Sequence, residues 1–406
     1  MRFMESPAYA LLGAVLLSLL FICTAVTYFT RFWYLATLSV LIIMVLQLKL
    51  DELLLWGDYG NYLALAFLII STYFFHAIKP NSPLSIRLLT IALIIAIYAT
   101  CVSMFGLTES PGLTAISYGL QLPVILALIF MVFVAGENIY SILKVTTAKG
   151  GRGKNNLFHF ITFGIIYNGI LILLFLNKRG EMDFELILIN PYTLLIISAI
   201  SAYLSFDIRL EKMSGIMPLT VLKKWVYPAL FVCTLILIAF AKITANDPLV
   251  EALEYGIIIT HLALGSAYFV SCFINFTPLI LQNLNVHKVY YKPTVAPNFL
   301  IGLVAFAGTV ALMFYVNVYP YYQLQAGLFN VQGDLSEYKE NDLLAEQYYK
   351  QGVAIDFVNF KSNFIIQKQK WIQLEQCLSR AETLRSMVLT KKGLLIITLK
   401  MSITKV

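Results

Sequence analysis

The feature that most constrains this chain is a series of apolar stretches about as long as a membrane is thick. A helix needs about 20 predominantly apolar residues to cross the hydrocarbon core of a bilayer. The sequence supplies ten such stretches: 7–29, 32–50, 60–78, 86–106, 116–136, 157–176, 187–206, 225–243, 256–276 and 298–318. Composition agrees, because 13% of the residues are charged, against about 25% in a soluble domain. We therefore predict an all-α fold: a polytopic transmembrane helix bundle of about ten spans.

Basic residues are distributed unequally between alternate loops of this ten-span topology. Lys and Arg are retained on the cytoplasmic side of a membrane. One set of loops carries thirteen of them, and the opposite set, counted with the N-terminus, carries five. This asymmetry predicts that both termini lie outside the cytoplasm. The outward segments contain no N-x-[ST] glycosylation acceptor, which favours a bacterial cytoplasmic (inner) membrane over a eukaryotic secretory one.

Two polar residues fall inside predicted spans. His261 lies in "GIIITHLALGSAYF" and Asn168 lies in "FGIIYNGILILL". Polar groups at this depth are costly, and they often mark a substrate or ion path. We therefore treat His261 and Asn168 as a candidate intramembrane polar site. The structural alternative is a neutral imidazole bonded to a neighbouring helix, with Asn168 joining two helices through a hydrogen bond.

The sequence lacks the patterns typical of metal, nucleotide and catalytic sites. The possible ligands expected near the inner interface are His76, Glu137, His159 and His287. They come from different stretches, and no pair has the spacing of a helical zinc motif. "AKGGRGKNN" at 148–156 departs from the phosphate-binding loop because Asn155 follows its Lys. We predict no metal, no cofactor and no nucleic-acid partner. Loops this short also favour a protein that is not an enzyme.

After Pro320 the chain becomes polar. "LFNVQGDLSEYKENDLLAEQYYKQGVAID" at 328–356 resembles one unit of the tetratricopeptide repeat, a 34-residue helix–turn–helix. The matching positions are Phe329, Gly333, Ala345, Tyr349 and Gly352. Three positions depart from the pattern, with Gln332, Ser336 and Phe357 in place of Leu, Tyr and Pro.

The resemblance implies both a geometry and a role. Two antiparallel helices should turn at 336–341, with Ala345 close to Gly333 and Tyr349 beside Phe329. Such repeats bind other proteins, although about three are usually needed to bury their shared faces. We therefore divide the chain into a transmembrane domain (1–320), an extracytoplasmic hairpin (321–362) and a basic tail (363–406).

The tail is the most basic part of the chain. It carries eight Lys or Arg and two Glu. Apolar residues at helical spacing predict an amphipathic helix over 367–390, which would lie on anionic headgroups. The alternative is a poorly ordered end.

Three functions remain open from the sequence. The first is a non-enzymatic multi-pass protein that anchors the hairpin in the bilayer for interaction with envelope proteins. The second is a small-solute or ion transporter that uses the bundle around Asn168 and His261. The third is a membrane-embedded transferase that acts on a lipid-linked substrate. A midplane cavity lined by Asn168 or His261 would favour transport, and a lateral groove with converging polar groups would favour transfer.

Overall fold

The apolar stretches form helices. The computed structural model describes residues 5–53, 59–106, 110–147, 153–182, 189–213, 221–284, 286 and 298–403, and every element assigned in them is a helix. The helices of the bundle are α1 (Glu5–Val26), α2 (Arg31–Leu46), α3 (Tyr59–Tyr73), α4 (Leu84–Phe105), α5 (Pro111–Gly119), α6 (Gln121–Ala135), α7 (Glu137–Thr147), α8 (Gly153–Lys178), α9 (Pro191–Met213), α11 (Tyr227–Ile243), α12 (Asp247–Leu281) and α13 (Asn298–Tyr315). Short helical turns of other types occupy Leu50–Glu52, Phe74–Ile78 and Leu222–Val226.

Seven helices are long and apolar enough to cross a membrane, or eight if one bent pair counts as a single span. The seven are Glu5–Val26, Tyr59–Ile78, Leu84–Phe105, Gln121–Thr147, Gly153–Lys178, Leu222–Ile243 and Asp247–Leu281. Two further apolar helices, Arg31–Leu46 and Pro191–Ser205, are shorter than 18 residues. The chain is therefore an all-helical protein with seven or eight candidate spans. The predicted number of ten is not confirmed, although an apolar helix lies in each predicted stretch.

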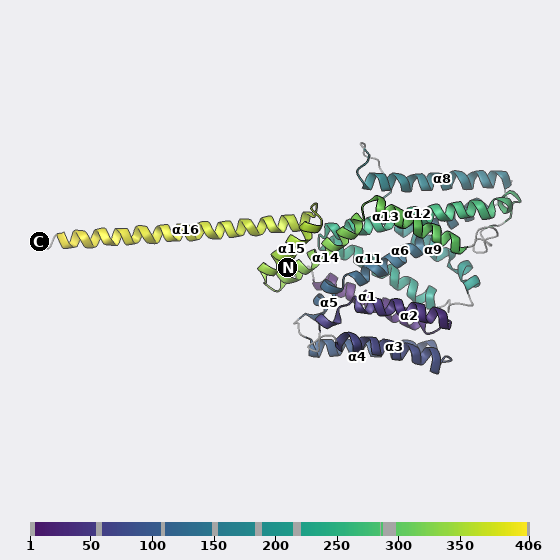
Figure 1. Cartoon of the computed structure of the whole chain (residues 1–406), viewed down its shortest axis with the longest axis horizontal. Helices are drawn as coiled ribbons and strands as arrows, with labels where there is room; N and C mark the ends of the chain where they lie inside the picture. The colour runs from purple at the N-terminus through teal and green to yellow at the C-terminus, as the bar shows by residue number, and fades with distance from the viewer. Residues whose placement is uncertain are drawn as a thin grey trace.

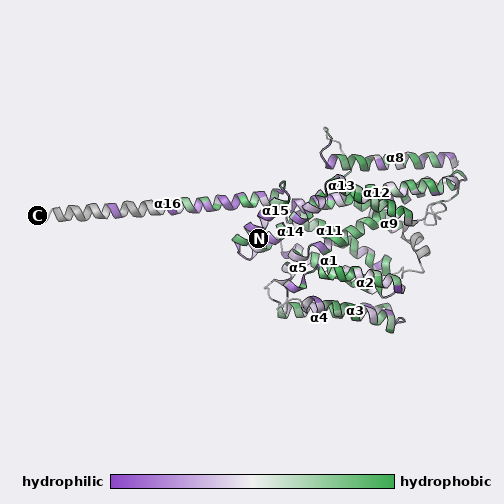
Figure 2. Ribbon diagram, viewed as in Figure 1, coloured by the Kyte–Doolittle hydropathy of each residue, from purple (hydrophilic) through white to green (hydrophobic). Residues whose placement is uncertain are grey.

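The bundle helices run side by side along the long axis of the molecule (Figure 1), and hydrophobic residues dominate them (Figure 2). α12 lies inside the bundle and packs against α6, α8 and α13. Helices at the edge leave apolar side chains uncovered, for example Leu89 and Leu93 on α4. Apolar surface on this scale is typical of helices that face lipid.

The predicted hairpin is formed by α14 (Tyr319–Tyr338) and α15 (Asp342–Ile355), which turn at 339–341. α14 begins before the predicted boundary at 320/321. It is inclined at 71° to the preceding helix, because Asn317 and Val318 both adopt left-handed φ angles of 53° and 56°. That conformation is a genuine outlier for a β-branched residue.

The two ends of the bundle are distinct. Glu5 at the start of α1 accepts a hydrogen bond from the Tyr338 hydroxyl of the hairpin. The N-terminus and the hairpin therefore share one end of the bundle, which we call the hairpin end. The other is the far end.

α16 (Phe360–Ile403) is a single 44-residue helix. It begins inside the range predicted for the hairpin and extends well past the helix predicted at 367–390. It projects from the hairpin end in roughly the direction of the bundle helices, rather than across them (Figure 1). The described side chains from Trp371 to Glu382 are exposed on every face.

Candidate functional site

His261 is completely buried on α12 and belongs to a polar network that joins several helices. Its Nδ1 lies 2.7 Å from the Ile257 carbonyl oxygen, and its Nε2 lies 2.8 Å from the Ser198 Oγ on α9. A carbonyl only accepts, so Nδ1 carries the proton and Nε2 is the acceptor that faces the Ser198 hydroxyl, which also lies 2.8 Å from the Leu194 carbonyl. Asn138 on α7 donates to the same Ser198 Oγ at 2.7 Å and to the Tyr167 hydroxyl on α8 at 3.2 Å. The imidazole therefore links α9 to α12 within a bonded network.

Asn168 joins a different pair of helices. Its Oδ1 accepts a hydrogen bond from Ser266 on α12 at 2.8 Å, and its Nδ2 donates to the Gly164 carbonyl at 2.8 Å. The hydrogen bonds of the described residues do not connect Asn168 to His261. Both residues thus act as interhelical links, which matches the structural alternative for each of them.

The hairpin packs through its small residues. A Cβ on Gly333 would lie 2.6 Å from the Tyr349 ring, so only glycine allows α15 to approach so closely. Ala345 and Tyr349 are fully buried. Phe329, however, stacks on Tyr348, with 6.4 Å between the ring centroids, where the sequence predicted Tyr349 beside it. Gly333 lies against Tyr349, and Asn330, earlier in α14, lies beside Gly352, later in α15. The two helices are therefore antiparallel.

Tyr349 also anchors a charged cluster. Its hydroxyl donates to Asp334 Oδ1 at 2.8 Å and to Glu337 Oε2 at 3.3 Å. Burial, together with these two carboxylates, raises the pKa of Tyr349 far above its ordinary value. The hydroxyl therefore stays protonated and donates throughout the physiological range.

The hairpin is clamped to the turn between α11 and α12. Lys361 Nζ lies 2.6 Å from Asp334 Oδ2 and donates to the Thr244 carbonyl at 2.6 Å. Asp247 accepts the backbone N–H groups of Phe360 and Lys361 at 2.8 and 3.1 Å, and so caps α16 from another part of the chain. We call Lys361, Asp334, Thr244 and Asp247 the clamp.

A second set of buried amides reinforces the clamp. Asn330 Nδ2 donates to the Oδ1 atoms of Asn246 and Asn359, each at 3.1 Å. Asn246 donates in turn to the Gly327 carbonyl at 2.8 Å. A Cβ on Gly352 would lie 3.0 Å from both Asn359 and Ser362, so this glycine gives the amides room. The hairpin is therefore seated on the bundle by satisfied polar groups.

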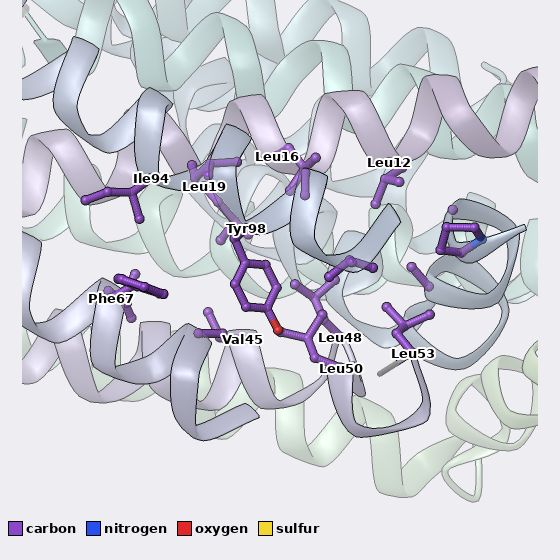
Figure 3. Close-up of a pocket in the computed structure, with 18 of the residues that line it drawn as sticks. Leu12, Leu16, Leu19, Val45, Leu48, Leu50, Leu53, Phe67, Ile94 and Tyr98 are labelled. Atoms are coloured by element: carbon purple, nitrogen blue, oxygen red, sulfur yellow. The ribbon is translucent and has the colours of Figure 1, made fainter. Parts of the chain in front are cut away.

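An apolar cavity of about 460 Å³ lies between α1, α2, α3, α4 and α5. Leucine, isoleucine and valine side chains line most of it, and Tyr98 points into it between Val45 and Leu48 (Figure 3). The Tyr98 hydroxyl donates to the Gly60 carbonyl at 3.0 Å. Neither Asn168 nor His261 lines this cavity, and its few polar groups do not converge on one point.

A second, more polar cavity of about 550 Å³ opens at the hairpin end. We call it the interface cleft. It is lined by Lys178, Arg179, Glu251, Tyr255, Val316, Asn317, Tyr319 and Tyr322. These residues come from the C-terminal end of α8, the first turns of α12 and the bend between α13 and α14.

The described residues contain no group of three or more His, Cys, Asp or Glu side chains that could hold a metal ion. His76 stacks on Tyr34, with the ring centroids 4.0 Å apart, and Glu137 accepts a hydrogen bond from Ser205. His287 and most of the 148–156 loop lie outside the described residues.

Sequence reasoning missed two features. Arg87 was counted as a loop cation, yet it is fully buried at the far end, where it donates to the carbonyls of Thr27, Pro80 and Ser82 and stacks on Tyr28 at 3.9 Å. The clamp was missed because the contacts that join it to the turn between α11 and α12 link residues 113 to 117 positions apart. The one local signal was Asp247, which directly precedes a Pro at the start of α12.

Comparisons with known protein families, with curated proteins and with solved structures find no match.

Proposed function

We propose that this chain is a ten-span membrane protein of the bacterial inner membrane that presents the hairpin outside the cytoplasm as a docking module for other envelope proteins. The observation that carries the proposal is the clamp, which holds the hairpin on the bundle while apolar side chains where α15 meets α16 stay exposed. The proposal has three parts: the number of crossings, the orientation and the docking surface.

Contacts at both ends of α2 support its crossing the membrane despite its length. Before α2, Thr27 receives the Arg87 guanidinium at the far end. After α2, Lys49 lies over the Tyr118 ring of α5, at 5.7 Å from its centroid, and α5 packs against α14 at the hairpin end. A helix that connects both ends of a bundle has to pass through it.

α9 is supported in the same way. Near its start, the Tyr192 hydroxyl donates to the Val250 carbonyl at 3.4 Å, beside the clamp. Between three and four turns later, Ser205 bonds to Glu137, which follows the end of α6 that points away from the hairpin. With both short helices and α13 counted, the crossings number ten. Glu5 contacts Tyr338, so the chain begins and ends its membrane region at the same end of the bundle. This requires an even number of crossings.

The orientation rests on the loop charges. With ten crossings, the thirteen-residue basic set belongs to the loops of the far end. The positive-inside rule then puts the far end in the cytoplasm and the hairpin outside.

The docking surface is an apolar patch where α15 meets α16. Phe357, Val358, Phe360 and Phe364, which we call the junction patch, are 83%, 67%, 72% and 57% exposed. Aromatic side chains that remain uncovered outside the bilayer are typical of protein interaction sites. The hairpin is a single repeat-like unit, and such units pack against neighbouring units, so this one keeps a face that a partner can cover. Hydrogen bonds that hold Asn168 and His261 within the bundle weigh against the transporter alternative.

Site-specific photocrosslinking in native membranes tests this function. A photoreactive residue at Phe357 or Phe360 should yield discrete protein adducts. The matched control is Lys350, which lies on the same hairpin and carries an exposed side chain. If the junction patch yields only lipid adducts, or the same adducts as position 350, the docking function is wrong.

A further inference from the structure

The interface cleft combines both signs of charge with aromatic rings. Lys178, Arg179 and Glu251 line it together with Tyr255, Tyr319 and Tyr322. Tyr255 and Tyr319 meet edge to face, with 6.4 Å between their centroids. The cleft therefore offers hydrogen-bond donors to an anion, and a carboxylate and ring faces to a cation.

The charged groups keep capacity for a ligand. Lys178 pairs with Glu254 at 2.7 Å, and Arg179 pairs with Glu181 at 2.9 Å. An ammonium has three donors and a guanidinium has five, so one carboxylate partner leaves donors available on each. Glu251 accepts a hydrogen bond from Gln323, and a carboxylate offers about four acceptor positions.

The position of the cleft points to a lipid. It opens at the ends of α8 and α13, two helices at the edge of the bundle. Below it, Phe314 and Phe306 on α13 and Ile172 on α8 are exposed. A molecule with its polar group in the cleft would have an uncovered apolar face beside it for acyl chains. Tyr side chains at this level of a span also match the composition of the membrane–water interface.

The charge balance selects the kind of headgroup. Glu251 lines the cleft and disfavours a purely anionic group, while Lys178 and Arg179 disfavour a purely cationic one. We propose that the interface cleft binds the headgroup of a zwitterionic phospholipid. The phosphate lies against Lys178 and Arg179. The ammonium lies against Glu251 and the rings of Tyr319 and Tyr322, as cations do over aromatic rings, because Lys178 already lies over the Tyr255 ring at 5.6 Å from its centroid.

Native mass spectrometry of the full chain in detergent tests this inference. The probes are phosphatidylethanolamine, phosphatidylglycerol (which lacks the ammonium) and soluble phosphoethanolamine (which lacks the chains). Phosphatidylethanolamine should bind about tenfold more tightly than phosphatidylglycerol, since one lost charged hydrogen bond is worth roughly that factor. It should also bind more tightly than phosphoethanolamine, which has no chains to bury. Arg179→Gln should weaken both lipids, whereas Glu251→Gln should abolish only the preference for phosphatidylethanolamine.

Controls keep the test decisive. Lys350→Gln removes a positive charge on the same side, outside the cleft, and should change nothing. Tyr322→Leu removes a ring from a half-exposed position, so it serves if Glu251→Gln fails to fold, and it should lower the preference about threefold. Equal binding of the two lipids would overturn the proposal. A preference for phosphatidylethanolamine that survives both Glu251→Gln and Tyr322→Leu would also overturn it. Soluble phosphoethanolamine binding as tightly as the lipid would overturn the lipid assignment.

Discussion

Replacing Lys361 with Met tests whether the clamp holds the hairpin to the bundle. The Lys361 and Asp334 side chains are only 11% and 13% exposed. Removing one partner of a buried ion pair costs about 3–5 kcal/mol, because the other charge is left uncompensated. Asp334 keeps its hydrogen bond from Tyr349 at 2.8 Å. We therefore expect the lower end of the range, about 3 kcal/mol.

The chain contains a matched control for this substitution. Lys350 pairs with Glu346 at 2.7 Å, almost the same separation, but its side chain is 59% exposed. Exposed pairs of this spacing contribute about 0.3–0.5 kcal/mol. Lys350→Met should therefore cost roughly a tenth as much as Lys361→Met, and the difference isolates the effect of burial.

Hydrogen exchange of the α15 amides is the appropriate assay, because it reports local opening of the hairpin. A loss of 3 kcal/mol corresponds to exchange about a hundredfold faster, whereas Lys350→Met should change it about twofold. Adding Asp334→Asn to Lys361→Met should recover most of the protection, since no unpaired charge remains. Equal exchange rates in the two Lys variants would refute the reasoning.

Four further outcomes can be tested. Burial raises the pKa of Asp334, and Lys361 lowers it. Without Lys361 the folded-state pKa of Asp334 rises further above its unfolded value, so the Lys361→Met defect should be largest at high pH and shrink on acidification. Hydrogen-exchange protection measured between about pH 5 and 8 would show this. A cysteine at residue 182 should react with an impermeant reagent added outside and one at 151 should not, and the reverse pattern would overturn the orientation. His261→Ala should lower the stability of the purified protein by at least about 0.6 kcal/mol, the average value of an interhelical hydrogen bond; a folded variant that loses a solute flux would favour transport instead. Ala345→Arg should release α15 from α14, because no space exists there for an unpaired charge, and unchanged exchange in α15 would argue against the packing.

Hydrophobic patterning predicted the helical membrane fold, because composition alone decides which segments avoid water. It could not decide the span count. α2 and the apolar part of α9 are helices shorter than 18 residues, so the case that they cross the membrane rests on their contacts with residues far along the chain. The break between α13 and α14 was predicted to within a few residues from the change in composition after Pro320. Its geometry was not, because Val318 adopts a left-handed φ that is an outlier for a β-branched residue.

The site was less predictable than the fold. Turn-forming residues between 336 and 341 indicate where the hairpin reverses. They do not indicate which aromatic side chain faces which helix, so Tyr348 rather than Tyr349 stacks on Phe329. Loop counting treats every cation alike, although Arg87 is buried among carbonyls. Pairings such as Asp247 with Lys361 depend on how distant segments meet, which local patterns do not encode.

The separation of Asp247 from Lys361 along the chain has a consequence for the order of assembly. A ribosome adds about 5–20 residues per second, so the 114 residues from Asp247 to Lys361 take on the order of 6–20 s to appear. During that interval the carboxylate of Asp247 lacks its partners, and the buried amide of Asn246 lacks its own until Gly327 and Asn330 have been made. The turn between α11 and α12 is therefore completed last, by a segment that emerges after every membrane helix has been made. Membrane insertion and the final folding step thus become separate events. A molecule that has completed only the first still has polar groups without hydrogen-bond partners at this turn.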